Sequence, residues 1–74
     1  GVIMTVTIEM IQERLREAIS QSGYKQTELA KKLGITQATV SDYMHKNKFP
    51  ALDTLANLCR ILDVSPAYIL CFEN

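Results

Sequence analysis

The sequence QTELAKKLGITQATVSDY occupies residues 26–43 and contains two short helix patterns separated by a turn. Gly34 ends the first helix because glycine adopts a positive φ without steric cost. Thr36 can cap the second helix, which we expect to run from Gln37 to about His45. The stretch therefore predicts two helices joined by a tight turn. Their expected inward-facing residues are Leu29, Ala30, Leu33, Val40 and Tyr43, with Ile35 from the turn.

The residues before this stretch predict one helix and a short arm. Apolar side chains recur at helical spacing over residues 8–19, Thr7 can cap the helix start, and Gly23 suits its end. The β-prone arm, residues 1–7, has three alternatives: a disordered arm, an edge strand or a segment that crosses to a second copy. The remaining residues, 8–74, form one domain. The expected inward face of the helix is Ile8, Ile11, Leu15, Ala18 and Ile19.

The residues after the stretch predict two more helices, so the expected fold is all-α with five helices. Pro50 interrupts the chain because proline disfavours a helical conformation in the residue before it. Residues 52–62 then carry an apolar helix face. Ser65 and Pro66 provide an N-cap followed by proline at the first helical position, which predicts a short last helix through Leu70. The expected inward face of the fourth helix is Leu52, Leu55, Ala56, Cys59 and Leu62.

The composition is that of one small globular domain. The chain has 74 residues, of which 47% are hydrophobic and 22% charged, which excludes a disordered tail or a collagen-like chain. No apolar run approaches the roughly 20 residues that span a bilayer, and no secretory signal is visible. A cytoplasmic location without a membrane partner is therefore expected. A domain of this size also has no room for a large catalytic cleft.

The charges are unevenly distributed along the chain. Eight basic and eight acidic side chains give a formal net charge of zero. Residues 25–48, however, contain five lysines against Glu28 and Asp42, whereas the flanking parts carry an acidic excess. This pattern places a positive patch on one part of the surface, although a merely solvated lysine-rich face gives the same pattern.

Metal, cofactor and catalytic sites are not indicated. Cys59 and Cys71 are too few and too far apart for a metal site or a redox motif, and they suit a reduced setting. Ser41, Asp42 and His45 have the residue types of a catalytic triad, but adjacent positions on one helix do not face each other. We therefore expect no enzyme activity, no metal, no cofactor and no small-molecule ligand.

The two helices around Gly34 have the arrangement of a helix-turn-helix, whose second helix is offered to the DNA major groove. Residues 26–70, QTELAKKLGITQATVSDYMHKNKFPALDTLANLCRILDVSPAYIL, resemble the Cro/C1-repressor type of helix-turn-helix domain, the XRE family, without a gap. The segment ERLREAISQSG, residues 13–23, extends the likeness. The resemblance implies a lambda repressor-like domain of five helices that binds double-stranded DNA. The residues in the family's register are Gln26, Leu29, Ala30, Gly34, Val40, Ser41, Tyr43, Pro50, Leu52, Leu55, Val64 and Ser65.

Four positions depart from the residues usual in that family. Lys25 and Ala51 stand where the family has a capping Ser or Thr, and Lys46 and Asp63 stand where it has glycine. Asn47 adopts a left-handed conformation at lower cost than lysine, so we expect it to supply the turn after the recognition helix. These departures concern helix ends and loop geometry, and the expected fold is unchanged.

The outer face of the helix that begins at Gln37 is the expected base-reading surface. Gln37 can pair bidentately with adenine, and Ala38 can contact a thymine methyl. Asp42 either accepts from cytosine N4 or disfavours other bases. A polar helix face in isolation is more often simply solvated, and the surrounding motif is what favours recognition. The expected base-reading residues are Gln37, Ala38, Ser41 and Asp42.

Residues at both ends of this helix are expected to contact phosphates, aided by helix N-termini. The resemblance also implies that Gln26 touches a phosphate and braces Gln37. His45 is expected beside the DNA backbone rather than as a pH switch. The expected backbone contacts are Gln26, Thr36, Thr39, His45, Lys46, Asn47 and Lys48.

An apolar patch near the C-terminus is the expected dimer interface, unless its residues only seal the core. The patch consists of Ile61, Tyr68, Leu70 and Phe72. The resemblance implies a transcriptional regulator, by default a repressor, that binds a palindromic operator as a homodimer. Because the family also includes antitoxins, a protein-interaction module is the alternative.

Overall fold

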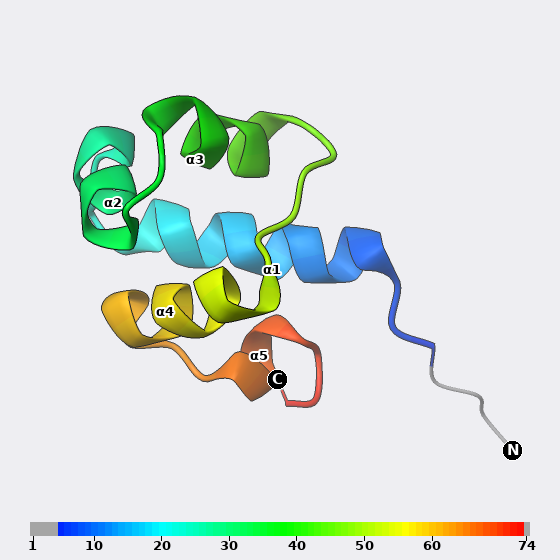
Figure 1. Cartoon of the computed structure of the whole chain (residues 1–74). Coiled ribbons are helices and arrows are strands. Elements are labelled where there is room, and N and C mark those ends of the chain that lie inside the picture. The colour runs from blue at the N-terminus through cyan, green and yellow to red at the C-terminus, as the bar shows by residue number, and fades with distance from the viewer. Residues whose placement is uncertain (1–4, 74) are drawn as a thin grey trace, which may run out of the picture.

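The computed structural model describes residues 5–73, and these form five α-helices and no strand (Figure 1). In the view of Figure 1, α1 lies across the middle of the molecule, with α3 above it and α4 and α5 below. The all-α fold expected from the sequence is confirmed. The helices are α1 (Ile8–Gln21), α2 (Gln26–Leu33), α3 (Gln37–His45), α4 (Leu52–Leu62) and α5 (Pro66–Ile69).

The expected caps define the starts of three helices. The Oγ1 atom of Thr7 accepts a hydrogen bond from the Met10 amide at 3.3 Å, and α1 begins at the next residue. Ser65 caps α5 in the same way, with Pro66 at its first position. Thr36 caps α3. Side chains that satisfy the free amides of a first turn stabilise a helix by about 1 kcal/mol each.

The core is built from apolar side chains of all five helices. Its fully buried side chains are Leu15, Leu29, Val40, Leu58 and Ile69. The sequence pattern correctly placed most of the core, including Cys59. Burying one such side chain is worth about 1.5–3 kcal/mol relative to leaving it in water, so each of these five contributes to the stability of the fold.

The prediction for the inward face of α4 was partly wrong. Leu52 is 86% exposed and Ala56 is also exposed, whereas Leu58, which is not on the predicted face, is completely buried. Leu52 opens the helix and lies beyond the edge of the core. The apolar stripe starts one turn later, at Leu55. At the start of α1, Ile8 is likewise 54% exposed.

The positions that depart from the family's usual residues differ in backbone conformation and in helix capping. Asp63 takes the left-handed conformation (φ 54°) in which the family has glycine. Lys25 makes no side-chain cap; instead the Glu28 carboxylate accepts from the Lys25 amide at 3.1 Å. Ala51 caps nothing. The expectation for Asn47 is wrong, because Asp63 and Cys71 are the only non-glycine residues of the described range with a positive φ.

The described part of the N-terminal arm, residues 5–7, is neither helix nor strand. Residues 1–4, and with them most of the arm and its three alternatives, lie outside the described residues. Among the helices that the structure describes, none is long and apolar enough to cross a membrane.

Candidate nucleic-acid interface

The turn between α2 and α3 fixes the angle at which α3 leaves the core. Gly34 takes a left-handed conformation (φ 70°), and the Ile35 amide donates to the Ala30 carbonyl at 3.0 Å. Ala30 is buried, and a small side chain there lets the two helices pack closely. Val40 and Tyr43 hold the inner face of α3 in the core. The opposite face of α3 is therefore turned outward (Figure 1).

The predicted base-reading residues share that outward face. Gln37 and Ala38 are exposed, and Ser41 and Asp42, one turn further along, are half-buried. Residues four apart on a helix lie on the same side. The four side chains thus form one surface of polar groups with a gap at Ala38.

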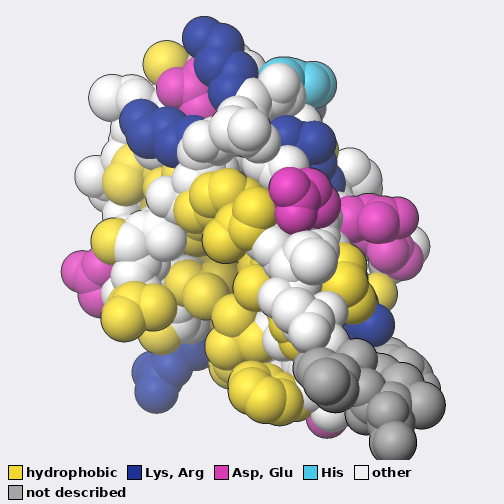
Figure 2. Space-filling view, turned by 90° about the vertical axis from the view of Figure 1, so that its right-hand side faces the viewer, with side chains coloured by type: hydrophobic (Ala, Val, Ile, Leu, Met, Phe, Trp, Pro, Cys, Tyr) yellow, Lys and Arg dark blue, Asp and Glu magenta, His cyan; other side chains and the backbone are white. Residues whose placement is uncertain are grey.

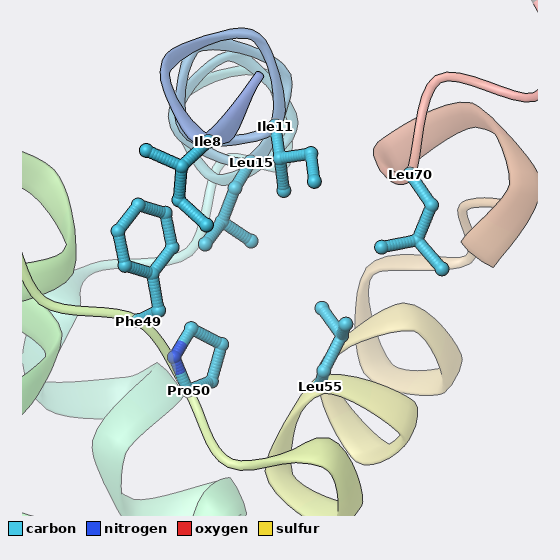
Figure 3. Close-up of a pocket in the computed structure, with 7 residues that line it drawn as sticks. All are labelled: Ile8, Ile11, Leu15, Phe49, Pro50, Leu55 and Leu70. Carbon is cyan, nitrogen blue, oxygen red and sulfur yellow. The ribbon is translucent and has the colours of Figure 1, made fainter. Parts of the chain in front are cut away.

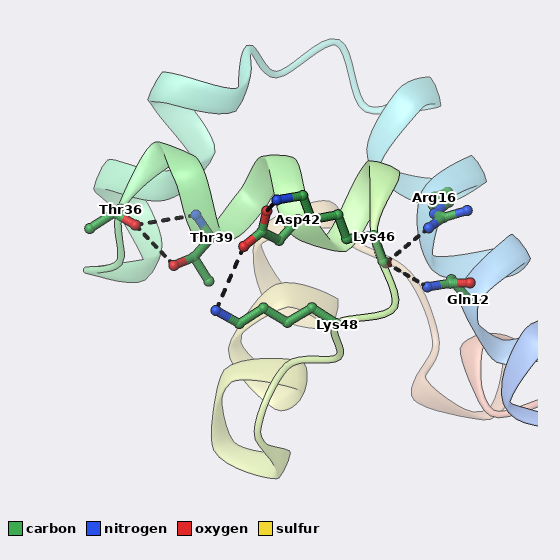
Figure 4. A network of polar contacts seen from close by, with 7 residues as sticks. All are labelled: Gln12, Arg16, Thr36, Thr39, Asp42, Lys46 and Lys48. Carbon is green, nitrogen blue, oxygen red and sulfur yellow. Dashed lines mark hydrogen bonds and ion pairs between the residues drawn. The ribbon is translucent and has the colours of Figure 1, made fainter.

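The start of α3 carries a pair of threonines. Thr36 Oγ1 accepts from the Thr39 amide at 3.2 Å and lies 2.9 Å from Thr39 Oγ1, so the two hydroxyls share a hydrogen bond (Figure 4). This pair fixes the side chains of both predicted phosphate contacts at the positive end of the helix dipole, where an anion is favoured.

The end of α3 carries two lysines that meet the carboxylate of Asp42. Lys46 Nζ lies 3.7 Å from Asp42 Oδ1, and Lys48 Nζ lies 3.8 Å from Asp42 Oδ2 (Figure 4). His45, Lys46, Asn47 and Lys48 are all exposed. The structure therefore brings one predicted base reader and two predicted phosphate contacts into a single charged group.

Two residues of α1, missed from the sequence, hold the end of α3 in place. Lys46 O accepts from Gln12 Nε2 at 2.9 Å and from an Arg16 Nη atom at 3.1 Å (Figure 4). In addition, Arg16 Nε donates to Tyr43 O at 3.1 Å. Helix C-termini leave carbonyl groups without intrahelical partners. Here side chains of α1 donate to two of these carbonyl groups, those of Tyr43 and Lys46, and Lys46 is extended (φ −127°) rather than left-handed.

A sequence signal for Gln12 exists. It stands between Ile8 and Leu15 at helical spacing, on the apolar face of α1, and it is only 7% exposed. A polar side chain inside an apolar stripe must find a hydrogen-bond partner when it is buried. The sequence pattern therefore marks Gln12 as a buried polar residue, but it does not identify the Lys46 carbonyl group as its hydrogen-bond partner.

The remaining predicted contact, Gln26, is half-buried at the start of α2. Gln37 is exposed at the start of α3. The bracing of one by the other, which the resemblance implies, stays a prediction.

The predicted dimer residues differ in their surroundings. Phe72 is 81% exposed, whereas Ile61 is partly buried against the core. The ring of Tyr68 lies under the Arg14 guanidinium, 4.8 Å from ring centre to Cζ, and Arg14 also donates to the Tyr68 carbonyl. These contacts tie α5 to α1. Leu70 lines an apolar groove.

That groove lies between α1, the loop before α4, and α5 (Figure 3). It encloses about 140 Å³. In Figure 2, which shows the side of the molecule at the right of Figure 1, apolar side chains gather across the middle, below the histidine and several basic side chains near the upper edge. The groove is lined by Ile8, Ile11, Leu15, Phe49, Pro50, Leu55 and Leu70.

Two titratable side chains, Tyr43 and Cys59, lie in the core. Burial raises the pKa of Tyr43 and of the Cys59 thiol. Cys59 therefore stays protonated near neutral pH, as expected of a core cysteine. Across residues 5–73, no group of histidine, cysteine and acidic side chains is placed to hold a metal ion.

Comparison with known proteins places this geometry in a family. Residues 14–74 match the Cro/C1-type HTH DNA-binding domain. The chain is 40% identical over 58 residues to the HTH-type transcriptional regulator ImmR of Bacillus subtilis. The matched stretch covers 78% of this chain and 46% of ImmR. It is 38% identical to two uncharacterized HTH-type transcriptional regulators of that organism, YobD (78% of this chain, 52% of YobD) and YqaE (88% and 56%).

The chain spans about half the length of these relatives. No solved structure gave a significant match. The family is one of DNA-binding domains, not of enzymes. The match covers α2, the turn at Gly34, α3, α4 and α5, together with most of α1. On this basis the chain belongs to the Cro/C1-type, or XRE, family of helix-turn-helix DNA-binding domains.

Proposed function

We propose that the chain is a cytoplasmic, sequence-specific transcriptional regulator that reads DNA with the outer face of α3. The observation that carries this proposal is the placement of Gln37, Ala38, Ser41 and Asp42 on one outward surface of the recognition helix. Gln37, exposed at the first turn of α3, is the side chain best placed to pair with an adenine edge in the major groove.

Phosphate contacts at the two ends of α3 would set its register on the duplex. Thr36 and Thr39 lie at the start of the helix with its free amides, and Lys46, Asn47 and Lys48 follow its end. Gln26 and His45 complete the proposed set. Such contacts position a protein on DNA and supply affinity that depends on salt, but they carry little sequence information.

The proposed DNA-bound form is a homodimer. The exposed Phe72 and the apolar groove that ends at Leu70 support this, because a small domain seldom leaves such groups in water without use. Two copies related by a twofold axis would bind half-sites about 34–36 Å apart, centre to centre. Repression, by blocking access of polymerase to an overlapping promoter, is the proposed outcome of binding.

Selection of bound duplexes from a random DNA pool tests this function. We expect enrichment of a sequence with two inverted half-sites separated by about one helical turn. A reporter gene placed behind the enriched sequence should then lose expression when the chain is present. A pool without any enriched sequence would contradict base reading by α3, and raised expression of the reporter would contradict repression.

A further inference from the structure

Asp42 is the one acidic side chain of α3, and it lies between two lysines that are both predicted to hold phosphates. Each carboxylate oxygen has its own partner: Oδ1 faces Lys46 and Oδ2 faces Lys48, at 3.7 and 3.8 Å (Figure 4). The carboxylate thus occupies the lysines much as the two free oxygens of a phosphodiester would.

These ion pairs add little to the stability of the fold. The side chains of Lys46 and Lys48 are 76% and 52% exposed, and exposed pairs contribute at most about 1 kcal/mol. Their effect on DNA binding is different in kind. Before either lysine can meet a phosphate it must leave Asp42, and the released carboxylate then stands near the negatively charged backbone.

We propose that Asp42 is an internal competitor of DNA phosphates for Lys46 and Lys48, and that it keeps binding to arbitrary sequences weak. The inference rests on the proposed function, since it assumes that α3 and the following loop face DNA. Sequence-independent affinity comes from phosphate contacts. If Asp42 weakens those contacts, the choice among DNA sequences depends more on base-reading residues such as Gln37.

The test replaces the carboxylate by its uncharged isostere, Asp42→Asn, and measures binding to a scrambled duplex over a range of salt concentrations. Freeing one more positive charge at the interface should raise the magnitude of the salt slope by up to about one. At about 0.1 M salt this corresponds to roughly fivefold to tenfold tighter binding. Thermal unfolding of each variant checks that the fold is kept.

Asp63→Asn is the matched control. It removes the same charge at the end of α4, away from α3 (Figure 1), and asparagine tolerates the left-handed conformation found there. The control should bind the scrambled duplex as the parent does. An equal gain in both variants would mean that overall charge, not the pairing of Asp42 with the lysines, sets the affinity, and would overturn the proposal.

A double-mutant cycle separates competition for the lysines from direct repulsion of DNA by the carboxylate. In a chain that already carries Lys46→Gln and Lys48→Gln, Asp42→Asn should give a much smaller gain, because only the direct repulsion between carboxylate and phosphates is left to remove. The same gain in both backgrounds would overturn the competitor role. The competitor role would also be overturned if Asp42→Asn left the affinity for the scrambled duplex unchanged. If the parent still preferred its selected duplex, that result would leave the proposed function intact. A parent that binds no duplex would overturn both.

Discussion

At the scale of single residues, Gln37 and the two lysines after α3 should behave differently on DNA. Gln37→Ala removes a bidentate amide while the phosphate contacts remain. We expect a loss of about 1–3 kcal/mol on the selected duplex and a relaxed choice at one base pair. Binding assays on selected and scrambled duplexes check this; an equal loss on both would show that Gln37 does not read a base.

Lys46→Ala and Lys48→Ala should instead weaken binding to all sequences alike. Each removes one phosphate contact, so each should lower the magnitude of the salt slope by about one. Titrations of the same two duplexes at several salt concentrations give the slope. If neither variant changes it, the loop after α3 does not face DNA.

Single residues were also where sequence reasoning was weakest. Leu52 and Leu58 are both leucines of one amphipathic helix, and only the way α4 rests on the core decides that the first is exposed and the second buried. The pairing of Asp42 with Lys48 joins a helix to a loop whose path is set by tertiary contacts. No periodicity in the sequence encodes either result.

At the scale of elements, the sequence was informative because local chemistry decides where these helices start and end. Thr7, Thr36 and Ser65 cap their helices through their own side chains, and Gly34 supplies a positive φ. The end of α3 is the exception. Two of its carbonyl groups accept hydrogen bonds from α1, more than 25 residues earlier in the chain, and local signals predicted a left-handed turn that does not occur.

This contact between α1 and α3 predicts the behaviour of Gln12→Ala. The substitution leaves the net charge unchanged, but it removes one of the two side-chain hydrogen bonds to the Lys46 carbonyl and leaves only that from Arg16. We expect a loss of about 1–3 kcal/mol in unfolding free energy and weaker binding to selected and scrambled duplexes alike, because the end of α3 and its lysines lose their support.

Chemical denaturation followed by DNA titration measures both effects. Gln21→Ala is the control, since Gln21 lies on the exposed side of α1 and bonds only to Glu17 within that helix. It should leave stability and binding close to those of the parent. A Gln12→Ala chain as stable as this control would mean that the α1 contact does not hold α3.

At the scale of the whole molecule, two surfaces differ in chemical character, and we propose a different partner for each. The α3 face is polar and is bounded by threonines at one end and lysines at the other, as suits DNA. The groove is lined by apolar side chains, and Phe72, which follows α5 in the chain, is also exposed. Ile61 is held by the core, so a charge there would test folding rather than association.

Phe72→Glu is therefore the sharper test of the proposed dimer. Its side chain is exposed, so the monomer should keep its fold, while a buried carboxylate would disrupt an apolar interface. We expect the variant to bind a single half-site about as tightly as the parent does, and to lose the additional affinity that the parent gains from a duplex with two half-sites. Analytical ultracentrifugation with each duplex measures the stoichiometry. Leu52→Glu is the control, because it adds the same charge at another exposed apolar residue and so measures the repulsion of DNA by that charge. If Leu52→Glu removes the additional affinity for a duplex with two half-sites and Phe72→Glu does not, the interface lies at the start of α4.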